Sequence, residues 1–301
     1  MSEFIQRIVS FLMSLLMPLL TSWGIAVKHF DKIDAVKYGT GASQVMDVYL
    51  PKDLSGNGSA VLFLHDGNFK DGSRGDMDND CQIIANKGYV AASMDYTLFG
   101  GSSKLVETVM GEITDAISAL KQTAADHGIT LKKLALSGIG AGGYYALMYA
   151  YGYAAYTTLT PQFVAVKGAP ADLSYDLWKN VYSAADFAAL VGALSGLKLT
   201  AAGFENNTDS AKNASASVSP VNVLDKARVF GKTPTIAAYA VNDAQVPYAN
   251  LQALEASLAR NSVAHTLVSF PNSDHSFKID LMQSSEYSEA VSNYCAQYLS
   301  N

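Results

Sequence analysis

From about residue 40 to the C-terminus, short runs of apolar and β-branched residues alternate with segments of helical period. Such alternation is typical of βαβ units, in which parallel strands are joined by helices that cover the sheet. We therefore predict one α/β domain over residues 31–301, with a mostly parallel central sheet flanked by helices. The predicted strands are 45–50, 60–65, 89–95, 134–137, 163–167, 235–240 and 265–270.

The composition excludes several classes of protein and partner. Hydrophobic residues make up 49% of the 301 residues and charged residues 16%, a balance that excludes an intrinsically disordered chain and a coiled coil. The net charge is -6 and the basic residues are scattered, so we expect no nucleic-acid partner. The two cysteines, Cys81 and Cys295, have no further ligand at metal-binding spacing, so we expect neither a structural metal nor another cofactor.

The N-terminal segment allows four interpretations. Residues 8–27 carry no formal charge, and such a run is long enough to cross a bilayer, although Pro18 interrupts it. A signal peptide is the second interpretation, and an amphipathic helix that lies on lipid or on a second copy of the chain is the third. An ordinary packed helix of the domain is the fourth. We expect residues 1–30 to form a hydrophobic helix of a secreted or membrane-anchored protein, with a cytoplasmic location as the alternative.

Residues 171–218 interrupt the alternation of strands and helices. A helical pattern over 184–197 is followed by a polar stretch, 204–217, rich in Asn, Ser and Ala. An insertion of this kind lies at the edge where α/β sheets bind ligands. We therefore predict a helical cap over a ligand pocket, with 204–217 as its mobile part.

A glycine-rich turn, Gly138 to Gly143, follows the predicted strand 134–137 and leads into a helix predicted to begin at Tyr144. A strand, a tight turn and a helix in this order are typical of the nucleophile elbow, G-x-S-x-G. Here the central position is Gly140, which has no reacting atom. A nucleotide-binding loop is disfavoured, because the turn lies in mid-chain and lacks both the acidic residue and the Lys that such loops require.

An acid and a histidine follow the elbow in chain order, each just past the end of a predicted strand. Asp243 follows strand 235–240, and His275 follows strand 265–270. In acyl-transfer catalysis the histidine takes and returns a proton, and the carboxylate fixes its tautomer and stabilises the imidazolium. We therefore predict Asp243 as the acid and His275 as the base of one site with position 140.

The turn after strand 60–65 reads His65-Asp66-Gly67-Asn68. At this place a hydrolase aims backbone N–H groups at the developing oxyanion, together with the N–H of the residue after the nucleophile. The predicted donors are Gly67, Asn68 and Ala141. Asp66 places a carboxylate beside an anion site, and the sequence offers no role for it.

Residues 45–277 resemble the α/β-hydrolase fold, and are most similar to bacterial esterases and lipases of the feruloyl-esterase-like and prolyl-peptidase-like branches. The marks are Asp47-Val48-Tyr49-Leu50-Pro51, the His65 turn, Asp95-Tyr96, the glycine-rich turn, Ser219-Pro220, Asp243 with Val246-Pro247, and His275 with Phe277. The resemblance implies a Ser–Asp–His ester hydrolase acting on a small-molecule ester or acyl substrate. It also implies Ser at position 140, where this chain has Gly.

Three hypotheses follow for the activity. The chain is an ester hydrolase whose nucleophile has been replaced, by design or by natural change; or it is a non-catalytic protein that binds a ligand in the capped pocket; or a water in the vacated space is activated by His275. On the first hypothesis, Gly140→Ser should restore hydrolysis if Asp243, His275 and the N–H donors are already in place.

Overall fold

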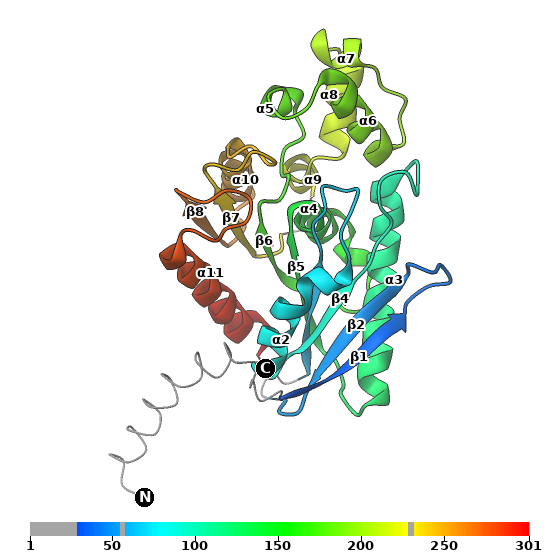
Figure 1. Cartoon of the computed structure of the whole chain (residues 1–301), viewed down its shortest axis with the longest axis vertical. Helices are drawn as coiled ribbons and strands as arrows, with labels where there is room; N and C mark the ends of the chain where they lie inside the picture. The colour runs from blue at the N-terminus through cyan, green and yellow to red at the C-terminus, as the bar shows by residue number, and fades with distance from the viewer. Residues whose placement is uncertain (1–28, 55–57, 228–231, 301) are drawn as a thin grey trace, which may run out of the picture.

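The computed structural model describes residues 29–54, 58–227 and 232–300 (Figure 1). These residues form an eight-stranded sheet in the order β1-β2-β4-β3-β5-β6-β7-β8. Pairing is antiparallel from β1 to β4 and parallel from β4 to β8, which confirms the predicted mostly parallel α/β fold. The strands are β1 (Phe30–Lys37), β2 (Val45–Pro51), β3 (Ser59–Leu64), β4 (Val90–Met94), β5 (Lys133–Ile139), β6 (Pro161–Lys167), β7 (Thr235–Ala240) and β8 (His265–Phe270).

Strand β1 is the strand that the sequence did not predict. It lies at the edge of the sheet, pairs only with β2 among the described strands, and exposes most of its side chains to solvent. An edge strand with one solvated face has no continuous apolar run, and charged residues there discourage pairing with other chains. The pattern that identified β2 to β8 is therefore absent from β1.

Helices cover both faces of the sheet. Leu62 and Leu64 of β3 pack with helices on one face, whereas the alternate residues Val61 and Phe63 pack with helices on the other. The first face carries α3 (Leu105–Asp126), α4 (Gly140–Met148), α9 (Pro220–Lys226) and α10 (Ala249–Arg260), and the second carries α2 (Asp78–Asn86) and α11 (Leu281–Tyr294). Short helical turns are η1 (Arg74–Met77), η2 (Tyr149–Tyr153), η3 (Ala154–Tyr156) and η4 (Cys295–Leu299).

The helix after the glycine-rich turn begins at Gly140, four residues before the predicted start at Tyr144. Strand and helix join directly because the glycines let backbones approach closely. A Cβ atom on Gly142 would lie 2.2 Å from the carbonyl oxygen of Leu64, and one on Gly138 would lie 2.5 Å from the carbonyl carbon of Gly142. Side chains are therefore excluded from both positions by contact.

The insertion between β6 and α9 forms four helices, which gather beyond one end of the sheet at the top of Figure 1. We call this group the cap; it comprises α5 (Tyr175–Trp178), α6 (Ala184–Ser195), α7 (Ala201–Glu205) and α8 (Asp209–Ser217). The segment 204–217 comprises the end of α7, the turn 206–208 and α8. Its expected mobility stays a prediction. Thr200 and Thr208 accept hydrogen bonds from the first turn of each helix, and Phe204 is buried against the ring of Phe187. The N-caps and this aromatic contact favour helices in a polar segment.

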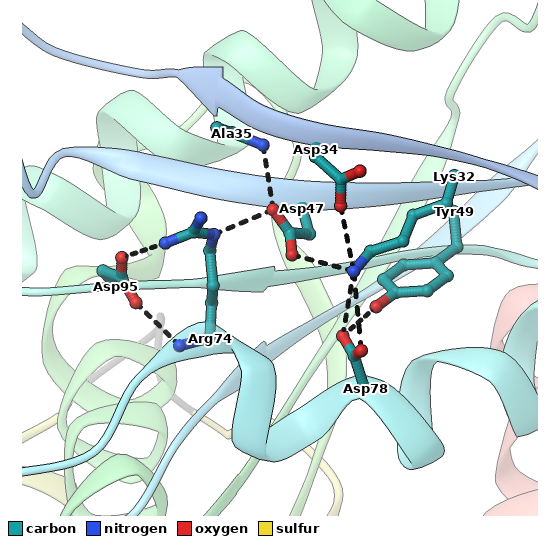
Figure 2. Close-up of polar contacts among 8 residues, drawn as sticks. All are labelled: Lys32, Asp34, Ala35, Asp47, Tyr49, Arg74, Asp78 and Asp95. Carbon is teal, nitrogen blue, oxygen red and sulfur yellow. Dashed lines mark hydrogen bonds and ion pairs between the residues drawn. The ribbon is translucent and has the colours of Figure 1, made fainter.

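A polar network ties β1, β2 and β4 to η1 (Figure 2). Arg74 donates from Nε to Oδ1 of Asp47 at 2.8 Å and from Nη1 to Oδ2 of Asp95 at 2.5 Å, and its backbone N–H donates to Asp95 at 2.7 Å. Lys32 completes the network with ion pairs to Asp47 and Asp78. Burial alone would raise the pKa of Asp47, but its hydrogen bonds from Ala35 N–H, Arg74 and Lys32 lower it. The network fixes the far end of the 65–77 segment, whose near end carries Asp66.

The N-terminal segment 1–28 lies outside the described residues, so its interpretations as a span, a signal, an amphipathic helix or an ordinary packed helix remain predictions. The predicted helix of residues 1–30 does not include Phe30, which begins β1. No helix between residues 29 and 300, the two internal gaps aside, is long and apolar enough to cross a bilayer. Cys81 and Cys295 are both buried and free.

Candidate active site

Four strand ends bring the three predicted catalytic positions together with Asp66. Asp66 follows β3, Gly140 joins β5 to α4, Asp243 follows β7, and His275 follows β8. These strands run parallel, so their carboxyl ends lie along one edge of the sheet, where ligand sites of α/β proteins form.

Asp243 and His275, the predicted acid and base, form a hydrogen-bonded pair. Oδ2 of Asp243 lies 2.6 Å from Nδ1 of His275, and Oδ1 accepts the backbone N–H groups of Gln245 and Val246 at 2.8 and 2.9 Å. The Asp243 side chain is only 1% exposed. A carboxylate held this firmly fixes the orientation of the imidazole and favours its charged form.

The loop that carries His275 is held by Asp280, a residue that the sequence did not single out. Oδ2 of Asp280 accepts hydrogen bonds from the N–H groups of Asn272 and Ser273 and from Ser273 Oγ, at 2.7 to 3.0 Å. The ring of His275 also passes close to Gly168, whose Cβ would lie 3.0 Å from Cε1 of the ring. The Asp280 bonds span only 7 and 8 residues, whereas Gly168 and His275 lie far apart in the sequence, so no local pattern predicts the Gly168 contact.

Asp66 occupies the space of the missing nucleophile. Gly140 has φ +51°, and a Cβ atom built on it would lie 2.0 Å from Oδ1 of Asp66. Oδ2 of Asp66 lies 2.8 Å from Nε2 of His275, the nitrogen that would face a serine hydroxyl in a Ser–His–Asp site. The vacated space is therefore filled by a carboxylate, which contradicts the hypothesis of an activated water there.

The three predicted oxyanion donors converge on the same carboxylate. Ala141 N–H donates to Oδ1 of Asp66 at 3.0 Å and Asn68 N–H donates to it at 3.3 Å, while a hydrogen bond from Gly67 N–H contributes to the lowered pKa of Asp66. The N–H groups of Ala141 and Asn68 thus point at one and the same oxygen atom, Oδ1 of Asp66. Asp66 itself supplies the anion that they bind.

The turn that presents Asp66 has an unusual backbone. Gly67, Asn68 and Phe69 follow one another with φ values of +131°, +49° and +66°. The left-handed conformation costs non-glycine residues about 1–2 kcal/mol each, so other contacts must hold the turn. Phe69 is buried against Tyr144 and Tyr145 of α4, which supplies such a contact.

Asp243, His275 and Asp66 form an ion triad, the name used below for these three side chains. Burial alone would lower the pKa of His275, but the hydrogen bonds and charges of Asp243 and Asp66 raise it to about 9. Burial would raise the pKa of Asp66, but His275 and the N–H groups of Ala141 and Gly67 lower it. At neutral pH the ring is therefore an imidazolium between two carboxylates, and it has no free lone pair with which to accept a proton.

The charged ring makes folding stability depend on pH between about 6.5 and 9. Folded His275 keeps its proton up to about pH 9, whereas an unfolded histidine releases it near 6.5. The stabilisation is complete below pH 6.5 and is lost as the pH rises through 9, roughly 3 kcal/mol in all.

In a ¹H–¹³C NMR titration we expect the His275 ring to titrate near pH 9, and about 1–2 units lower in Asp66→Asn. A parent midpoint below 7 would rule the ion triad out.

Little free space remains beside the ion triad. The cavity bounded by Asp66, Gly140 and His275 has a volume of about 10 Å³, room for one water at most. Trp178 of α5 and Tyr182, which follows this helix, line it, and the Tyr182 hydroxyl donates to Oδ1 of Asn68 at 2.6 Å. An ester can enter only if Asp66 or these aromatic residues move.

Comparison with known proteins places this site in a family. The BD-FAE family model matches residues 46–258, more than half of the chain. No curated protein matches the chain by sequence. One similar solved structure is esterase B from Lactobacillus rhamnosus, with 19% identity, coverage of 94% of this chain and 96% of that one, and a TM-score of 0.69. Another is an esterase from the planctomycete Thermogutta terrifontis with bound propionate, with 18% identity, coverage of 89% of this chain and 94% of that one, and a TM-score of 0.65. A carbohydrate esterase from gut microbiota is similar in fold as well, with 14% identity, coverage of 91% of this chain and 98% of that one, and a TM-score of 0.68. The chain belongs to the BD-FAE family of α/β-hydrolase esterases.

Proposed function

We propose that this chain carries the acid and the base of a Ser–Asp–His carboxylic ester hydrolase without its nucleophile, and that it does not hydrolyse esters in this form. One observation supports this above all others: the Asp66 carboxylate binds His275 Nε2 through one oxygen and Ala141 N–H through the other. In an active site of this type, those partners belong to the nucleophile and to the oxyanion.

The Asp66 carboxylate imitates the charge that the site would stabilise during catalysis. With Ser at 140, His275 would take the hydroxyl proton, and the backbone donors would bind the negative charge of the tetrahedral intermediate. A permanent carboxylate in that place keeps the His275 ring in its charged form and accepts the hydrogen bonds of the backbone N–H donors. Both effects oppose catalysis, beyond the loss of the nucleophile itself.

For the substrate class of the site with Ser at position 140, we propose a small-molecule carboxylic ester or acyl compound. The support is the family together with a solved structure of the similar esterase B that is inhibited by a tributyrin phosphonate. The second candidate function is non-catalytic ligand binding under the cap. It is favoured by the presence of Trp178 and Tyr182 beside a site that lacks a nucleophile.

We also propose that residues 1–30 direct the chain to a membrane or out of the cytoplasm, or mediate self-association. The support is the uncharged stretch 8–27. Fractionation of the native host tests this proposal, and full-length monomer found only in the soluble cytoplasm would overturn it.

The functional proposal is tested by hydrolysis of p-nitrophenyl acetate and butyrate between pH 7 and 9.5. We expect the parent chain and His275→Ala to give the same rate, close to that of buffer, because without a Ser only about 10³–10⁴ of the normal acceleration remains even with open oxyanion donors. Here Asp66 occupies those donors. A clear rate that disappears in His275→Ala would show that Asp66 or a water does serve as a nucleophile, and would overturn the proposal.

A further inference from the structure

A small cavity lies on the second face of the sheet, between α2 and α11, and is called the α2–α11 cavity below. Its volume is about 90 Å³, room for several waters or for one ligand of a few heavy atoms. Strands β3, β5 and β6 form its floor and the two helices form its walls, which together include Phe63, Asp80, Ile84, Ser137, Lys167 and Tyr287. None of the described residues that line this cavity also lines the one beside the ion triad.

The amine of Lys167 faces the α2–α11 cavity. Lys167 is the last residue of β6, and Phe163 and Ala165 of the same strand pack on the second face, so the alternation of side chains places Lys167 there too. Its Nζ lies 4.9 Å from the centroid of the Tyr287 ring. Within the described part of the chain, Nζ makes no hydrogen bond or ion pair, yet it is not sealed from water. The amine is therefore open to a ligand in the cavity.

Asp80 places the opposite charge in the same cavity. It lies in the first turn of α2, and between residues 29 and 300, the two internal gaps aside, its carboxylate forms no ion pair and no hydrogen bond with another residue. Burial raises the pKa of Asp80 and lowers the pKa of Lys167, whereas the charge of each side chain acts on the other in the opposite sense. The two charges are thus neighbours and partly desolvated, and no direct contact between them offsets the cost of burial.

The other lining groups narrow the chemistry of a ligand. Lys87 is exposed to solvent and already donates from Nζ to Ser292 Oγ at 2.7 Å. Ser137 Oγ, on the floor, has no hydrogen-bond partner among the described residues and can donate or accept. Much of the remaining wall is apolar, and Ile83 of α2 is 44% exposed there. The described lining therefore offers an unpaired cation, an unpaired anion and an apolar surface.

We propose that the α2–α11 cavity binds a small zwitterion, an α-amino acid with a short apolar side chain. Its carboxylate pairs with Lys167, its ammonium group pairs with Asp80, and its side chain packs on the apolar wall. A simple anion would be repelled by Asp80 and a simple cation by Lys167, whereas a zwitterion satisfies both charges at once. The proposal goes beyond the proposed function, because this cavity and the ion triad share no residue.

The test is a ¹H–¹⁵N NMR titration of the full chain with glycine, alanine and valine, and with acetate and methylammonium as the separate halves of the ligand. We expect alanine or valine to give saturable shifts in α2, α11 and the end of β6. Acetate and methylammonium should each bind at least about ten-fold more weakly, because each lacks one of the two charge-assisted hydrogen bonds.

Two substitutions should change the selectivity of the cavity as well as its affinity. Lys167→Met keeps the length and the apolar stem of lysine; it should weaken alanine binding about ten-fold and tighten methylammonium binding, because the Asp80 charge then acts alone. Asp80→Asn should weaken alanine binding to a similar extent and tighten acetate binding. The control Lys132→Met, at an exposed lysine outside the cavity, should leave all three affinities unchanged.

Acetate binding as tight as that of alanine would reduce the cavity to an anion site at Lys167 and would overturn the proposal. Equal alanine affinity in Lys167→Met and the parent would overturn it as well. So would the absence of shifts with all three amino acids at high millimolar concentration. None of these results bears on whether the ion triad hydrolyses esters.

Discussion

Replacing Gly140 by Ser and Asp66 by Gly in the same chain should raise the rate of p-nitrophenyl butyrate hydrolysis by ~10³-fold or more over the parent. The loss of the serine from a comparable triad costs ~10⁶ in turnover, so partial recovery is a large effect. The double change supplies the hydroxyl beside His275 Nε2 and frees the N–H groups of Asn68 and Ala141 for the oxyanion.

Gly140→Ser alone should stay near the rate of the parent chain. The sequence by itself predicted that this single change would suffice, but a Cβ at 140 would lie 2.0 Å from Oδ1 of Asp66. The carboxylate would have to leave its hydrogen bonds, and the new hydroxyl would compete with it for His275. The obstacle is a contact between residues 66 and 140, which no local pattern reveals.

Two controls accompany the double variant. Adding His275→Ala should abolish the gain, and Asp66→Gly alone should give none, because it opens the site without supplying a nucleophile. A folded double variant no faster than the parent would show that the site has lost more than these two side chains, and would favour the ligand-binding function. A single Gly140→Ser variant as fast as the double one would show that Asp66 does not block the site.

Arg74→Met should lower the free energy of unfolding by about 2–3 kcal/mol, between the values for exposed and for buried ion pairs, because Arg74 is 27% exposed and Asp47 keeps its ion pair with Lys32. The side chain of Asp47 is 6% exposed and that of Asp95 is 18% exposed, so both carboxylates would lose their guanidinium partner in a place that water reaches poorly. Methionine keeps the length and the apolar stem of arginine, which limits the effect to the charge and its hydrogen bonds.

Urea unfolding followed by circular dichroism measures this change. The control is Lys52→Met, since the Lys52–Asp31 pair is more than half exposed at both ends and such pairs contribute about 0–1 kcal/mol. Equal, small losses in the two variants would show that the network in Figure 2 is not what holds η1 to the sheet.

Periodicity and chain order were sufficient to predict most of the fold and the place of the site. Strands β2 to β7 are buried on almost every side chain, so their sequences are continuous apolar runs. Asp243 and His275 could be found because each follows a strand directly. The sheet edge β1, with its mostly exposed side chains, has no comparable signal.

The role of Asp66 depends on distances that the sequence does not contain. The presence of a carboxylate in the turn after β3 was visible, but its bonds reach Ala141 and His275, which are 75 and 209 residues away along the chain. The same limit applies to Trp178 and Tyr182. From the sequence alone, an aromatic residue in a cap can belong either to the hydrophobic core or to the wall of a pocket, and only the packing of the cap decides between the two.

The close fit between the Asp66 carboxylate and Gly140 also has an evolutionary consequence. Serine at 140 is of no use while Asp66 remains, and loss of Asp66 is of no use while 140 is glycine, so neither substitution alone gives selection anything to favour. Because residues in contact have non-additive effects, the two positions form an epistatic pair. A lineage carrying both residues would need both substitutions, with an inactive single variant between them, to hydrolyse esters. The combination of Asp66 and Gly140 is therefore difficult to reverse one substitution at a time.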